Sequence, residues 1–187
     1  MVAKKCKLED LHPGLNYQLS YHLGRVKGLT PEVKSFNFKL IHMILPSKER
    51  ISQILPNSSP ICTLCRADEP ESVLHAIFNC EQNRRAAGYL LDLTRIYDNT
   101  ITQEKIMKLE IVTDALYELP TMAVLCSGLN LIWRNRKERK VTRLYDIRAE
   151  LECIIQTLRK SRTKKLREAS KIISNTIENF PVDFASV

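Results

Sequence analysis

The chain has 187 residues, 44% of them hydrophobic, which supports a globular core and excludes a fully disordered protein. It contains no run of about 18 apolar residues, so the composition excludes a membrane-spanning helix. The net charge of +8 is concentrated, because residues 134–171 hold fourteen Lys and Arg residues against five Asp and Glu. This local excess of positive charge predicts a polyanionic partner.

Helical patterns dominate the first half of the chain. Residues 15–24 allow a short helix, and Thr30 and Pro31 suit the N-cap and first position of the next helix. Its apolar residues recur at helical spacing until Pro46. Ser47 suits the cap of a second short helix that stops at Pro56, so the sequence predicts two consecutive helices here.

Beyond Cys80 the helical pattern continues nearly to the end of the chain, and no stretch alternates clearly enough to predict a strand. We expect helices over residues 84–97, 102–116, 119–140, 145–160 and 165–180. The sequence therefore predicts an all-α fold. A small helical domain is followed by long helices with basic faces.

Three of the six cysteines lie between residues 62 and 80, in the pattern Cys62-x2-Cys65-x9-His75-x4-Cys80. Zinc in closed structural sites takes four tetrahedral Cys and His ligands. The first ten residues lack the apolar core of a secretory signal, which favours a reducing compartment, where clustered cysteines bind metals more often than they form disulfides. We therefore predict that Cys62, Cys65, His75 and Cys80 bind one structural Zn²⁺.

The segment with His75 and Cys80 has a helical pattern, which constrains such a site. Five residues of α-helix advance about 500°, leaving the two side chains roughly 140° apart. The helix must therefore distort or end between His75 and Cys80 if both bind. The alternatives are buried cysteines without a metal and a redox Cys-x2-Cys motif. The latter normally follows a strand, and none is predicted before Cys62.

The segment from residue 31 to 83 resembles the zinc-binding domain at the C-terminal end of reverse transcriptases from non-LTR (LINE-type) retrotransposons. The resemblance rests on Leu45-Pro46, the Cys62/Cys65 pair, Glu71-Ser72 with His75, and Cys80, and continues loosely through Trp133 and the basic run after it. It implies three parts: an N-terminal arm (1–30), the zinc-binding domain (31–83) and a helical extension (84–187). It also implies a non-catalytic module that helps a polymerase hold RNA or target DNA. Consistently, the chain contains no Tyr-x-Asp-Asp polymerase motif and no recognisable endonuclease set.

Two basic runs flank the apolar-faced helix expected at 145–160. Arginine suits phosphate because its planar guanidinium can bind two oxygens. Solvated helix faces with i,i+4 ion pairs are the alternative. Trp133 and Tyr145 lie at the edge of this region and can stack on bases, although the apolar surroundings of Trp133 favour the core. The predicted phosphate contacts are Arg134, Arg136, Lys137, Arg139, Lys140, Arg143, Arg159, Lys160, Arg162, Lys164 and Lys165.

The first functional hypothesis is thus a nucleic-acid-binding accessory domain that contacts RNA or DNA through the phosphate backbone. The rest of a reverse transcriptase is a further expected partner. The second is a zinc-stabilised helical protein-interaction domain, with the apolar residues 119–133 as an exposed interface. A zinc enzyme is disfavoured, because four protein ligands leave no open position on the metal. We expect no small-molecule substrate, no membrane association, and an intracellular location in the nucleus or a cytoplasmic ribonucleoprotein.

The remaining histidines and cysteines do not form a site in the sequence. His42 lies in an apolar helical pattern, and His22 has no ligand partner at a suitable spacing. Cys6, Cys126 and Cys153 are scattered, and the last two lie on apolar helical faces. We expect Cys126 and Cys153 to be small core residues.

Overall fold

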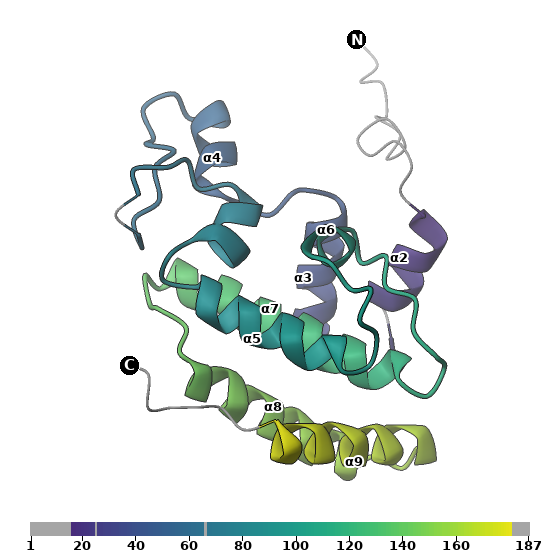
Figure 1. The fold of residues 1–187 in the computed structure, drawn as a ribbon. Coiled ribbons are helices and arrows are strands. Elements are labelled where there is room, and N and C mark those ends of the chain that lie inside the picture. Colours follow the sequence, from purple (N-terminus) through teal and green to yellow (C-terminus); the bar gives the residue numbers. More distant parts are fainter. Residues whose placement is uncertain (1–15, 25, 66, 181–187) are drawn as a thin grey trace.

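The computed structural model describes residues 16–24, 26–65 and 67–180 (Figure 1). In these ranges the fold is all-α, as predicted, and the only extended pairing is an isolated antiparallel bridge between Ile61 and Pro70. The helices are α2 (Tyr17–Gly24), α3 (Pro31–Ile41), α4 (Lys48–Ile54), the π-helical segment η1 (His75–Asn79), α5 (Arg84–Arg95), α6 (Gln103–Lys108), α7 (Glu118–Lys137), α8 (Leu144–Arg159) and α9 (Lys164–Asn179).

Local capping sets the N-termini of α3 and α4, as the sequence predicts. The Thr30 hydroxyl accepts a hydrogen bond from the Val33 N–H at 3.3 Å, and Pro31 occupies the first turn of α3. The Ser47 hydroxyl accepts from the Arg50 N–H at 3.3 Å and caps α4. Each cap satisfies a helix N–H that has no partner within the helix.

The helix predicted over residues 102–116 is shorter in the structure. Leu109 has the left-handed conformation (φ 51°), and the Glu110 N–H bonds to the Lys105 carbonyl at 2.8 Å, which closes α6 at Lys108. Left-handed backbone is unfavourable for a leucine. The side chain of Leu109 is fully buried, so its packing offsets this cost.

Helix α7 is the centre of the molecule and packs against α3, α5, α8, α9 and η1 (Figure 1). Residues 119–133 are buried, so the prediction that this stretch forms an exposed interface is wrong. Trp133 lies in the core at 3% exposure, as its apolar neighbours indicate. The apolar half of α7 supplies the core of the fold.

Helices α8 and α9 form an antiparallel hairpin along α7 (Figure 1). The connection from α7 to α8 and the turn from α8 to α9 therefore lie at opposite ends of α8. Since α8 has 16 residues, the two ends are about 24 Å apart. Each of the two basic runs lies at one of these ends.

One continuous hydrophobic cluster includes residues from Val26 to Ile177. It joins α3, α5, α7, α8 and α9, which come from both the predicted zinc-binding domain and the predicted extension. The boundaries after residues 30 and 83 remain predictions. The two segments share a core in this structure.

Gly128 allows the close approach of α7 to α5. A methyl group there would overlap the side chain of Leu90, which is fully buried. We expect Gly128→Ala to lower the free energy of unfolding by roughly 1–2 kcal/mol, because overpacking outweighs the gain in helix propensity. Urea unfolding would measure this. Gly88→Ala is the matched control, since a methyl group at Gly88 meets no atom within 4 Å, and it is expected to stabilise α5. Equal effects of the two variants would contradict the packing argument.

Candidate metal centre and basic surfaces

A short backbone clamp closes the loop that carries the first two cysteines. The Cys62 N–H bonds to the Glu69 carbonyl at 2.9 Å, and the Glu71 N–H bonds to the Pro60 carbonyl at 2.8 Å. These two bonds flank the Ile61–Pro70 bridge and fix both ends of the loop. The loop therefore presents Cys62 and Cys65 from a closed turn.

The distortion predicted between His75 and Cys80 is present as the π-helical segment η1. The Cys80 N–H bonds to the His75 carbonyl at 2.6 Å, five residues back, which adds one residue to the helical turn. Cys80 then leaves the helix with extended backbone. The Ser72 hydroxyl accepts from the His75 N–H at 3.0 Å and holds the start of this turn. Both side chains consequently reach the same side of the segment.

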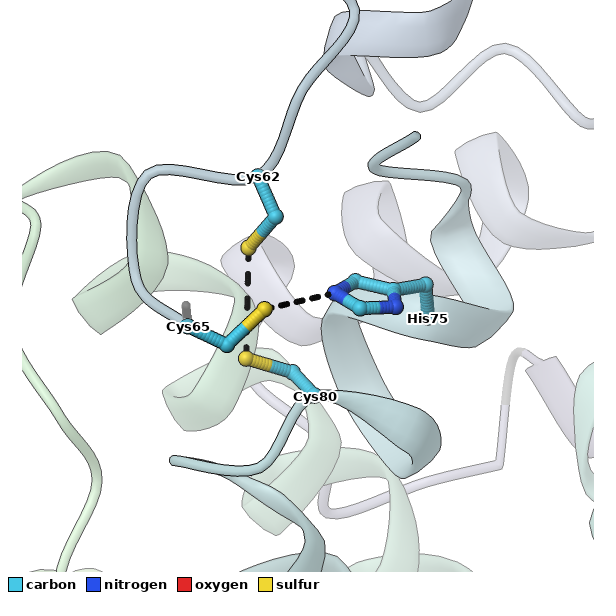
Figure 2. A group of neighbouring side chains, drawn as sticks. All are labelled: Cys62, Cys65, His75 and Cys80. Carbon is cyan, nitrogen blue, oxygen red and sulfur yellow. Dashed lines mark hydrogen bonds between the residues drawn. The ribbon is translucent and has the colours of Figure 1, made fainter. Parts of the chain in front are cut away.

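The four predicted ligands converge on one point (Figure 2). Their ligand atoms all lie within 4.8 Å of one another, and all four residues are buried. The sulfurs of Cys62 and Cys80 are 3.9 Å apart, and the Cys65 sulfur is 3.4 Å from His75 Nε2. Tetrahedral zinc with bonds of about 2.3 Å to sulfur and 2.0–2.1 Å to nitrogen requires separations close to these. The group fits one metal ion, and the sulfurs are too far apart for a disulfide.

Without a metal ion, the thiolate form of Cys80 is disfavoured at this site. Burial, together with the nearby Cys62 and Cys65, raises the pKa of the Cys80 thiol to about 12. Three buried thiolates repel each other unless a positive charge lies among them. A bound divalent metal would supply that charge and displace the protons.

His75 also has a partner outside the ligand set. Its Nδ1 lies 3.0 Å from the carboxylate of Glu69, while Nε2 faces the cysteines. A carboxylate that accepts from the second ring nitrogen fixes the orientation and tautomer of a metal-binding histidine. Sequence reasoning missed Glu69, although a carboxylate six residues before a ligand histidine in the same loop was visible.

We expect Glu69→Ala to weaken metal binding about tenfold, because His75 loses the group that orients it. Competition between the protein and a chelator for Co²⁺ or Zn²⁺ would measure the affinity. Glu81→Ala is the control, since Glu81 is an exposed carboxylate next to a ligand cysteine. An unchanged affinity in the Glu69 variant would show that the carboxylate does not orient the histidine.

Arg136 corrects one of the predicted phosphate contacts. Its guanidinium is 7% exposed and pairs with Glu71, whose side chain is 2% exposed; Arg136 Nε is 2.9 Å from Glu71 Oε1. It also donates to the Pro46 carbonyl at 3.2 Å and lies 4.2 Å from the centre of the Trp133 ring. Arg136 is thus a buried structural residue, unavailable to a phosphate, and it joins α7 to the loop that carries the metal ligands.

The other predicted basic residues are at or near the surface, in two groups. The first, the metal-side basic loop, consists of Lys137, Arg139, Lys140 and Arg143. The second, the hairpin-end cluster, consists of Arg159, Lys160, Arg162, Lys164 and Lys165. Arg134 is half-buried and lies 3.5 Å from Glu150 and 3.8 Å from Glu32.

Few of these cations are neutralised. Among the residues that the structure describes, Lys140 has Asp146 at 3.9 Å and Lys164 has Glu168 at 3.7 Å. The structure adds Arg167 and Lys171, which with Lys164 and Arg159 line a groove of about 590 Å³ between α8 and α9. The sequence spacing could have indicated Arg167 and Lys171, since residues 164, 167 and 171 lie on one face of a helix.

The remaining histidines and cysteines lie apart from the metal centre. His22 is 3.2 Å from Glu118. Burial lowers the pKa of His42, whose ring packs at a tilt against Phe38 with the ring centres 4.1 Å apart. Cys126 is buried as predicted, but Cys153 is exposed, so its assignment to the core is wrong. Cys6 lies outside the described residues.

No protein-family model matches this sequence, and neither a curated protein nor a solved structure matches it. In the described ranges, no helix is both long and apolar enough to span a membrane. The resemblance to the zinc-binding domain of non-LTR reverse transcriptases therefore remains a prediction. The metal centre and the charged surface are the features from which a function can be argued.

Proposed function

We propose that this protein is a non-catalytic, zinc-stabilised helical domain that binds RNA or target DNA through the phosphate backbone of the nucleic acid. Its predicted place is that of the C-terminal zinc-binding segment of a non-LTR retrotransposon reverse transcriptase. The proposal has two parts, a structural Zn²⁺ held by the Cys3His group and a phosphate-binding surface beside it.

The observation that carries the proposal is the attachment of the metal-side basic loop to the metal centre. The Asn83 side chain donates to the Ala76 carbonyl of η1 at 2.9 Å and accepts from the Thr142 N–H at 3.4 Å. The Thr142 hydroxyl accepts from the Asn135 amide of α7 at 3.2 Å. Asn83 is fully buried. A metal that orders η1 thereby also orders the loop that presents four cations.

A second observation concerns the first turn of α9. Lys164 and Lys165 lie there, and no acidic residue accompanies them. Positive charge at a helix N-terminus opposes the helix dipole, at a cost of about 0.3–1 kcal/mol for each residue. An anion bound at this end would relieve the repulsion. Phosphate groups are anions that bind such N-termini and lysines together.

The metal would have a structural task in this proposal. Cys3His supplies four protein ligands, which leaves no position for water or substrate. Zn²⁺ would hold the 61–80 loop against α7 and fix the position of the basic loop. No enzymatic activity is proposed.

The test is a binding titration of zinc-loaded protein against labelled structured RNA, duplex DNA and single-stranded DNA at several salt concentrations. We expect affinity to fall steeply with salt, with a slope of about −0.9 for each duplex phosphate contacted. Changing Lys137, Arg139, Lys140 and Arg143 to neutral residues should flatten that slope. Arg139→Gly is the sharpest single change, because Arg139 has a left-handed backbone (φ 55°) that glycine adopts without cost.

Two results would contradict the proposal. Binding no tighter than about 10⁻⁴ M at physiological salt is no better than the weakest non-specific binding. An unchanged salt slope after neutralising the basic loop would exclude that loop as the phosphate surface.

A protein-interaction role is the second candidate, and a specific surface favours it. Helix α4 contains no buried residue, and large apolar side chains are exposed at the ends of α3 and α4 and in the residues that directly follow these helices. These are Phe38, Met43, Ile44, Ile54 and Leu55. Failure of the nucleic-acid titration would make this surface the better account.

A further inference from the structure

A pocket of about 520 Å³ lies between the start of α5 and the start of α8, next to the metal centre. Both helices begin at the same end of the molecule (Figure 1). Volumes of this size hold small organic ligands. Its lining includes Arg85 and Ala86 from α5, and Val141, Arg143, Leu144 and Tyr145 from the start of α8 and the residues before it.

The lining combines an aromatic ring, two guanidinium groups and apolar side chains. Tyr145 is 52% exposed, although large aromatic side chains are usually covered. The Arg143 guanidinium lies 5.9 Å from the centre of its ring. Ala86, Val141 and Leu144 are apolar, and Arg85 adds the second positive charge. An exposed ring stacks on a nucleobase, and guanidinium groups pair with phosphate.

The pocket is held in shape by buried groups. Asn83 lies between Gln82 and Arg85 in the chain and bonds to Thr142, on the opposite wall. The Asp146 carboxylate caps α8 by accepting from the Arg143 N–H at 2.9 Å, so it is engaged with the backbone. Walls fixed in this way lose little conformational entropy when a ligand binds.

We propose that this pocket holds one unpaired nucleotide, with its base stacked on Tyr145 and its phosphate paired with Arg143 and Arg85. The inference rests on the proposed function and narrows its ligand to nucleic acid that has a single-stranded segment or end. A base inside a duplex is stacked on both faces and cannot offer one to Tyr145. An unpaired base can do so at little cost.

The test compares two labelled probes by fluorescence anisotropy, a blunt duplex and the same duplex with a short single-stranded overhang. We expect the zinc-loaded protein to prefer the overhang by roughly tenfold or more, the range for stacking of one base. Tyr145→Ala should remove the preference, whereas Tyr145→Phe, which keeps the ring, should retain it. Lys164→Gln is the control at the far end of α8, and it should weaken binding of both probes and leave their ratio unchanged.

Each outcome decides one point. A ratio that is the same for the wild type and Tyr145→Ala overturns the pocket assignment while leaving the proposed function in place. Absence of binding to both probes overturns the two together. If a nucleoside monophosphate displaced the overhang probe at equal concentration, the pocket would be assigned to a free nucleotide. That result would overturn the proposal that it holds a nucleotide of a nucleic-acid strand. Urea unfolding of Tyr145→Ala checks its fold, which we expect to be intact because the ring is half-exposed.

Discussion

Loading the metal-free protein with Zn²⁺ is expected to raise its free energy of unfolding by about 4 kcal/mol when free Zn²⁺ is 1,000 times Kd. The metal binds the folded arrangement of four buried ligands, and the unfolded chain does not offer this arrangement. The three cysteines form a cluster separate from the main hydrophobic core. We therefore expect the backbone amides of the 61–80 segment to lose protection from hydrogen exchange in metal-free protein, while α7, α8 and α9 remain helical.

Urea unfolding with and without Zn²⁺ measures the stability, and hydrogen exchange locates the change. Bound Co²⁺ reports on the ligands, since tetrahedral thiolate coordination of this ion has strong visible absorption. Cys80→Ser should diminish that absorption. Cys153→Ser is the matched control, because that cysteine is exposed and outside the cluster. Equal stability with and without Zn²⁺ would contradict a structural metal.

Breaking the buried ion pair between Glu71 and Arg136 is expected to cost about 3–5 kcal/mol. Either single truncation leaves an uncompensated charge in a site that excludes water. Glu71 also accepts a hydrogen bond from the Lys48 N–H at 3.2 Å, so Glu71→Ala leaves this N–H without its partner as well. Chemical denaturation of Glu71→Ala and Arg136→Ala would measure the loss.

The double variant Glu71→Leu/Arg136→Met separates charge from packing. Well-packed apolar residues often replace a buried ion pair at little cost. We expect the double variant to be more stable than either truncation, which a double-mutant cycle would quantify. If Arg136 acted chiefly on nucleic acid, its truncation would reduce binding without lowering stability, the opposite of what its burial implies.

The sequence alone was sufficient for those features that depend on neighbouring residues. Thr30 and Ser47 cap their helices through bonds that span three residues. The ligand set follows from its spacing, and the need to bring His75 and Cys80 together predicts the distortion that η1 provides. The local geometry can be predicted in each case because the interacting groups are close in the sequence.

Features that depend on distant residues were not predictable. Arg136 looks like a surface cation in its basic run, and its partner Glu71 lies 65 residues earlier. The early end of α6 depends on a buried leucine in left-handed backbone, where a glycine would have been a visible signal. The pocket that contains Tyr145 is lined by residues near 83 and residues near 143, which only the folded chain brings together.

If the proposed phosphate contacts form at both ends of α8, the length of this helix sets a minimum ligand length. Its ends hold separate groups of cations about 24 Å apart, a distance that equals roughly seven nucleotide steps along one duplex strand. Under that proposal, a shorter strand would occupy one end at a time. A longer strand held at one end would meet the other end at a high effective concentration, so avidity would be restricted to ligands that reach across the helix.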